Sequence, residues 1–188
     1  MNSSFLEDRR RALEEAFFTK KNQELLKKMQ AELAKETTIE QLKAASCLSD
    51  ERLLQSLVDH GISAESLAAL SLVPLVLVAW ADGRLEDRER QAILSAANEA
   101  GITQTAPAFS LLTNWLEHEP EADLKDLWSS YIAALQKSLD AQAREKLQHA
   151  VLGCAHRVAT AAGGLLGIGS ISPAETKVLE ELKQAFES

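Results

Sequence analysis

Acidic side chains gather around a two-residue helix break at Asp82-Gly83. An apolar segment ends in V-A-W-A, and the break is followed by Glu86, Asp87 and Glu89. Carboxylate oxygens are the ligands that calcium and magnesium prefer, so these acids could bind a hard divalent cation. They also suit a helix start, where acids accept hydrogen bonds from free backbone N–H groups and oppose the helix dipole. Because the spacing is not the D-x-D-x-D-G of a calcium loop, capping is the simpler interpretation.

A weaker copy of this stretch follows about eighty residues later. A-W-A-D-G-R-L-E-D-R-E aligns with A-T-A-A-G…I-S-P-A-E, so Leu85 matches Ile171 and Glu89 matches Glu175. Ala162 stands where the first copy has its aspartate, and about six extra residues lengthen the second turn. Two such helix-break-acid-helix hairpins predict a pseudo-twofold helical bundle.

The elements that position these acids are expected to be helices. Eight glycines, four prolines and few alternating Val/Ile/Thr runs favour long helices over a sheet. The run L-V-P-L-V-L-V could be a strand, but it would have no partner strand, so a buried helix opened by Pro74 is preferred. The predicted fold class is all-α, a helical bundle with two pseudo-repeated hairpins plus N-terminal amphipathic helices. We expect helices over 5–35, over 39–47 with Thr37 or Thr38 as its cap, after Ser49, from Pro74 to Ala81, over 87–100, from Pro107, from Pro120, over 140–162 as the central helix, and from Pro173.

Charge and hydropathy exclude several functional classes. The net charge is −8, of which residues 1–70 contribute −2 and residues 71–188 contribute −6. A phosphate backbone would be repelled, so we expect no nucleic-acid partner, and cations or basic protein surfaces instead. The longest apolar run, Leu67 to Ala81, has fifteen residues and is interrupted, which is too short for a membrane span. Without a signal-peptide pattern, and with Cys47 and Cys154 expected to be reduced, the expected location is cytoplasmic.

The motif A-D-G-x-[LIV]-x-x-x-E, followed by a helix and an echo of itself, resembles the TerB-like domain. This helical domain occurs in bacterial tellurite-resistance proteins and in some membrane co-chaperones of the J-domain class. The resemblance covers residues 70–188 and makes residues 1–69 an N-terminal helical extension. No His-Pro-Asp triplet is present, so it does not extend to J-domain activity.

The resemblance implies a non-enzymatic interaction or stress-response module that binds a divalent metal through acids near the two turns. Transferred position by position, the candidate ligands are Asp82, Glu86, Glu89 and Glu175, and Ala162 removes a second aspartate. The protein is then expected to bind either no cofactor or a divalent metal ion, and its expected partner is a protein. The oligomeric state stays open.

Two alternatives remain. The N-terminal pattern D-R-x-x-A-L-E-x-x-F, from Asp8 to Phe17, is similar to the opening of the small helical inhibitor of the alphaproteobacterial ATP synthase. This similarity implies a regulator of a partner enzyme that acts through the N-terminal helix. The other alternative is a metal-dependent enzyme with Glu89 as base. His118, between two glutamates, could also join a loose metal cluster, and the Gly163–Gly169 loop could hold an anion, although packing explains that loop better.

Overall fold

The computed structural model describes residues 3–46, 48–161 and 171–187, with the side chains of Lys21 and of Leu25 onward in those ranges. Every regular element in these ranges is helical, which confirms the predicted all-α class. The elements are α1 (Ser3–Ser46), α2 (Glu51–Asp59), the 3₁₀ helix η1 (Leu67–Leu72), α3 (Val73–Ala79), α4 (Asp87–Glu99), α5 (Pro107–Glu117), α6 (Leu124–Gln136), α7 (Ala141–Ala161) and α8 (Pro173–Gln184).

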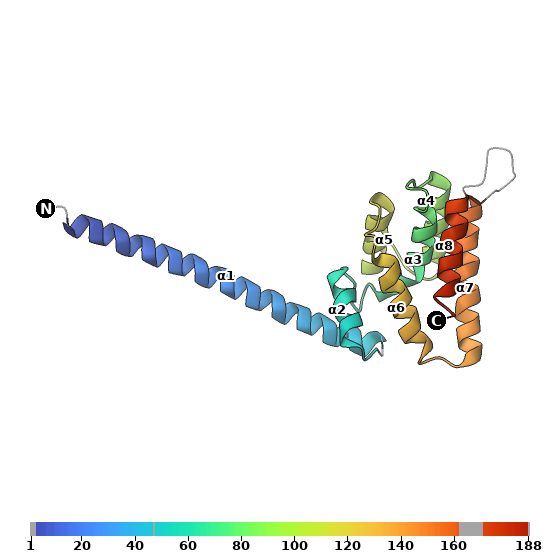
Figure 1. Cartoon of the computed structure of the whole chain (residues 1–188), viewed down its shortest axis with the longest axis horizontal. Coiled ribbons are helices and arrows are strands. Elements are labelled where there is room, and N and C mark those ends of the chain that lie inside the picture. The colour runs from blue at the N-terminus through green and yellow to red at the C-terminus, as the bar shows by residue number, and fades with distance from the viewer. Residues whose placement is uncertain (1–2, 47, 162–170, 188) are drawn as a thin grey trace.

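One long helix projects from the bundle. α1 has 44 residues, about 66 Å at 1.5 Å per residue, and most of it extends away from the other helices (Figure 1). The predicted break before residue 39 is wrong. The hydroxyls of Thr37 and Thr38 donate to the carbonyls of Leu33 and Ala34 at 2.9 Å, so both threonines stay inside the helix instead of capping a new one.

The bundle is built around α3. Six of its seven residues are buried, and it contacts η1, α4, α6, α7 and α8. α7 packs against α3, α4 and α8, as expected for a helix with a wide apolar surface. Trp128 of α6 is fully buried and meets Phe186 edge-on, with ring centroids 5.8 Å apart. The core therefore joins α3 to the two helices that carry the acid repeats, α4 and α8.

Two predicted helix starts differ from the structure. α2 begins after Asp50, not Ser49, because the Asp50 carboxylate accepts hydrogen bonds from the N–H groups of Arg52 and Leu53. Pro120 does not open a helix; α6 begins four residues later, with Asp123 as its N-cap. The proline starts of α3, α5 and α8 are confirmed.

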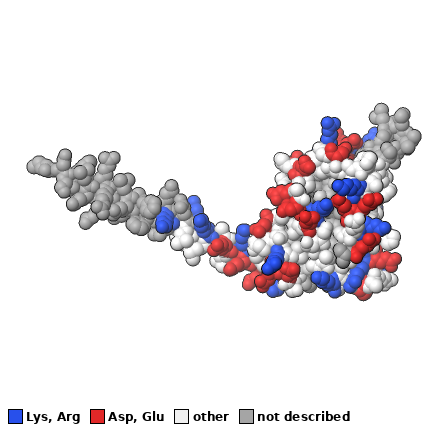
Figure 2. All heavy atoms as spheres, viewed as in Figure 1, with Lys and Arg blue, Asp and Glu red and all other residues white. Residues whose placement is uncertain are grey.

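The surface of the bundle carries many acidic side chains. Asp and Glu residues are spread over the face seen in Figure 2, as the net of −6 over residues 71–188 leads one to expect. Among the helices of the described residues, none is both long enough and apolar enough to cross a membrane.

Candidate functional site

The two repeat helices begin with the same local structure. The N-cap of α8 is Ser172, whose hydroxyl accepts from the Glu175 N–H at 3.1 Å, while Glu175 Oε2 accepts from the Ser172 N–H at 2.6 Å. In α4, Glu89 Oε2 accepts from the N–H of the N-cap residue Glu86 at 2.8 Å. Each repeat glutamate thus closes a capping box at the third helical position. The capping predicted for Glu89 and Glu175 is confirmed.

Both capping glutamates are buried, which capping alone does not require. Glu89 is 3% exposed and Glu175 is 7% exposed. Most capping carboxylates lie at the surface, where water solvates the second oxygen. In Glu175 that second oxygen, Oε1, is buried and has no hydrogen-bond partner. A buried carboxylate oxygen without a hydrogen-bond partner lowers the stability of the folded state.

The predicted acids interact electrostatically with Glu89, but no three of these four described residues bring donor atoms within 4.8 Å of one another. Burial raises the pKa of Glu89 to about 7, against the hydrogen bond from Glu86, which lowers it. The charge of Glu175 raises this pKa further, and so do the charges of Glu86 and Asp82. The charges of the other three predicted ligands therefore act on the buried carboxyl group of Glu89, although Glu89 and Glu175 are 86 residues apart. Such mutual repulsion favours binding of a proton or a cation.

Asp82 and Glu86 lie at the solvent side of this group. Both side chains are exposed, and Asp82 Oδ1 accepts from the Arg84 N–H at 3.0 Å, which closes the turn after α3. Gly83 has a φ of +78°, a backbone conformation that residues with a Cβ rarely adopt. The Asp-Gly break thus turns the chain sharply so that α4 can start beside the buried α3.

Several of the remaining predicted features lie outside the described residues. Ala162, the Gly163–Gly169 loop and Cys47 lie outside the described residues, so the second turn of the repeat is not placed. The side chain of His118 is exposed at the end of α5. Cys154 is a free, half-buried thiol on α7.

A second group of possible metal ligands has no counterpart in the sequence motifs. Among the described residues, one set of three His, Cys, Asp or Glu side chains brings a donor atom from each to within 4.8 Å of the others, namely His60, Glu121 and Asp123. The available signal was weak, because His60 is a single histidine before Gly61 and the acids lie sixty residues further on. Only the folded chain brings the end of α2 to the start of α6.

Comparison with protein-family models, with curated proteins and with solved structures finds no match to this chain. The resemblance to the TerB-like domain therefore remains a prediction based on the repeat. The two polar sites and α1 are the features of the molecule that bear on its function.

Proposed function

We propose that the protein is a non-enzymatic helical module of the TerB-like type that binds a divalent cation between the starts of α4 and α8. Glu89 and Glu175 would be the protein ligands. One observation carries this proposal: Glu175 Oε1 is buried without a hydrogen-bond partner, and the charge of Glu175 acts on a second buried carboxyl group, that of Glu89. A cation would neutralise both charges and satisfy the free oxygen.

The donor set favours a hard cation. It contains carboxylate oxygens alone, which suit magnesium, manganese or calcium better than zinc. Each glutamate already gives Oε2 to its own helix start, so the second oxygen of each would be the ligand atom, and that of Glu175 is buried without a hydrogen-bond partner. Water molecules would complete the coordination, as is common for magnesium, and the exposed Asp82 and Glu86 could hold those waters.

Calorimetric titration with manganese, magnesium and calcium chloride tests this function. We expect the full chain to bind one equivalent of at least one of these ions and Glu175→Gln to bind at least about tenfold more weakly, as for ligand-shell changes in other metal sites. Glu180→Gln is the matched control, because Glu180 is an exposed glutamate on the same helix. The absence of binding heat for all three ions, or equal binding by Glu175→Gln, would contradict the proposal.

A second candidate function is supported by α1. Leu25, Leu26, Met29 and Leu33 are each 56 to 64% exposed, although large apolar side chains are usually covered. Their spacing places them along one side of the projecting helix. Residues 20–35 contain five lysines and two glutamates, a local net of +3. We infer that this part of α1 docks into an apolar groove with an acidic rim on a partner enzyme. The similarity of Asp8–Phe17 to the ATP synthase inhibitor implies a regulator that acts through the same helix.

ATP hydrolysis by a purified bacterial F1-ATPase tests this second function. The full chain should inhibit hydrolysis, and the double variant Leu26→Asp/Met29→Asp should inhibit at least about tenfold less, because truncating or charging central interface residues often costs more than 1 kcal/mol each. Gln30→Ala, an exposed change between the apolar positions, is the control. Equal inhibition by the double variant, or no inhibition by the full chain, would refute a role for α1 in this regulation.

A further inference from the structure

A separate polar cluster lies where α2 meets the start of α6. His60 follows α2 as its C-cap residue, and Glu121 and Asp123 lie in the connection that leads into α6. His60 Nε2 is 3.1 Å from Asp123 Oδ1 and 3.9 Å from Glu121 Oε2. The His60 side chain is 15% exposed, whereas both acids reach the solvent. One nitrogen and two carboxylate oxygens thus converge from two parts of the chain.

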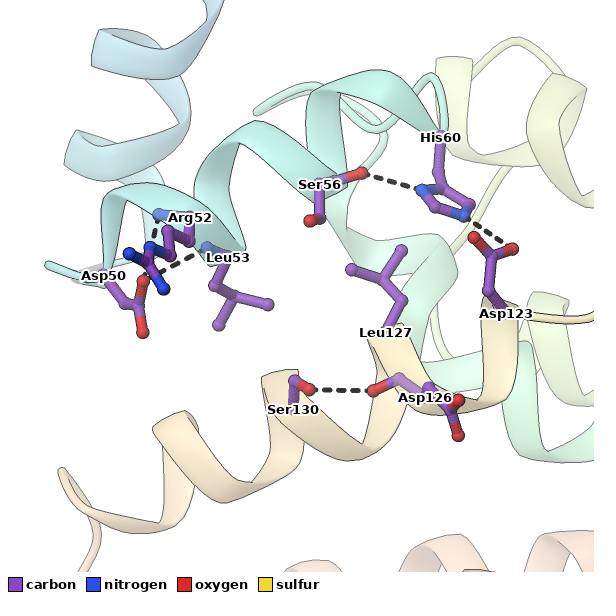
Figure 3. Close-up of a pocket in the computed structure, with 9 residues that line it drawn as sticks. All are labelled: Asp50, Arg52, Leu53, Ser56, His60, Asp123, Asp126, Leu127 and Ser130. Carbon is purple, nitrogen blue, oxygen red and sulfur yellow. Dashed lines mark hydrogen bonds and ion pairs between the residues drawn. The ribbon is translucent and has the colours of Figure 1, made fainter.

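The orientation of the His60 ring suits a metal ligand. Its Nδ1 lies 2.8 Å from the carbonyl oxygen of Ser56, one turn earlier in α2. A carbonyl can only accept, so Nδ1 carries a hydrogen, and Nε2 is the ring atom directed at Asp123 (Figure 3). An Nδ1–H donated to a backbone carbonyl is the usual second interaction of a metal-binding histidine, because it fixes the tautomer and the ring orientation.

The distances fit a single small cation. In a tetrahedral site with ligand bonds of about 2.0 to 2.1 Å, two ligand atoms lie about 3.4 Å apart. The two distances from Nε2, 3.1 and 3.9 Å, lie on either side of this value. Small rotations of the exposed carboxylates would therefore complete the geometry without moving the helices.

We propose that His60, Glu121 and Asp123 bind a divalent cation of the zinc class, such as zinc, cobalt(II) or nickel. A mixed set of one imidazole nitrogen and two carboxylate oxygens suits these borderline ions better than calcium or magnesium. Three protein ligands leave one position for water or an external ligand. A hollow of about 460 Å³, lined by His60, Glu121 and His118 among others, provides space for it.

Such an ion would also tie α1 to the bundle. α1 packs against α2, and α2 packs against α6. The cluster lies at this second contact, where His60 and Asp123 connect the end of α2 to the N-cap of α6. Binding would thereby hold the base of the projecting helix in place.

Cobalt(II) is the probe for this site, because tetrahedral cobalt absorbs visible light strongly. We expect the chelator-treated full chain to bind one equivalent of cobalt(II) with ligand-field bands, and zinc to displace it. His60→Gln and, as a second variant, Asp123→Asn should each weaken binding by more than about tenfold. His149→Gln, an exposed histidine on α7, should bind as the parent does. Circular dichroism checks that each variant is folded.

The two cation sites can be told apart. Glu89→Gln/Glu175→Gln should abolish binding of the hard cation and leave the cobalt bands unchanged. His60→Gln should weaken the cobalt bands and leave binding of the hard cation unchanged. The absence of cobalt bands in the full chain, or unchanged bands in His60→Gln, would overturn the His60 site and reduce it to an ion pair. Neither of these results would bear on the site between α4 and α8.

Discussion

Replacing Glu89 with glutamine should stabilise the cation-free protein at neutral pH. The carboxyl group is buried, and this burial, with the charge of Glu175, raises its pKa from 4.5 to about 7. A folded-state pKa above the unfolded value means that the native state holds its proton where the unfolded state does not. The contribution of Glu89 to stability is then fully present below pH 4.5 and is lost as the pH rises through about 7. Glutamine keeps the acceptor oxygen for the Glu86 N–H and cannot ionise.

The size of the effect follows from the two pKa values. A change from 4.5 to about 7 corresponds to at most about 3 kcal/mol, which is the free energy that ionising Glu89 costs the folded state. Above pH 7 the variant should exceed the parent by up to this amount, and near pH 4.5 the gain should disappear. For a chain of this size, the corresponding rise in Tm is up to about 10 °C.

Urea unfolding at pH 4.5, 6, 7 and 8 in the presence of a chelator measures this difference. The difference between variant and parent is the quantity to follow, because the titrating groups that do not interact with Glu89 contribute equally to both. Glu180→Gln serves as the exposed control. A constant difference between Glu89→Gln and the parent across this range would refute the argument that Glu89 is a stressed buried carboxyl group. Adding a bound hard cation should remove the advantage of the variant, because the ion favours the ionised parent.

Three further changes test the packing around the sites. Trp128→Ala should lose about 3 to 5 kcal/mol of unfolding free energy, measured by urea titration, because it empties a fully buried position and removes the ring contact with Phe186; a loss below 1 kcal/mol would contradict this packing. Gly101→Ala, at a φ of +77°, should lower stability by about 1 to 2 kcal/mol in thermal unfolding, whereas an unchanged Tm would mean that the α4 end can relax. Lys125→Ala removes a half-exposed ion pair with Glu181 at 2.8 Å and should cost at most about 1 kcal/mol, less in high salt; a larger, salt-independent loss would point to packing instead.

Helix boundaries could be predicted from the sequence where capping residues, prolines and glycines agree with the packing. Pro173 and the capping box before it mark the start of α8, and the Asp82-Gly83 break lies where the chain turns between α3 and α4. Thr37 and Thr38 led to a wrong helix boundary, because a threonine hydroxyl can either cap a helix or donate to a carbonyl one turn earlier within it. Leu42, fully buried near the end of α1, anchors the helix that continues through both threonines. Sequence signals alone could not reveal that anchoring contact.

The sequence repeat predicts residues of the site at α4 and α8 but none of the site at His60. Glu89 and Glu175 occupy matching positions in the predicted repeat, and the fold buries both and lets the charge of one act on the other. The alignment could not indicate that both glutamates are buried. The buried Glu175 Oε1, which has no hydrogen-bond partner, is the reason to consider these capping residues as cation ligands. His60 and Asp123 have no such relation, since their contact depends on how α2 lies across α6. The first site therefore tests the inferred repeat, whereas the second tests the packing of α2.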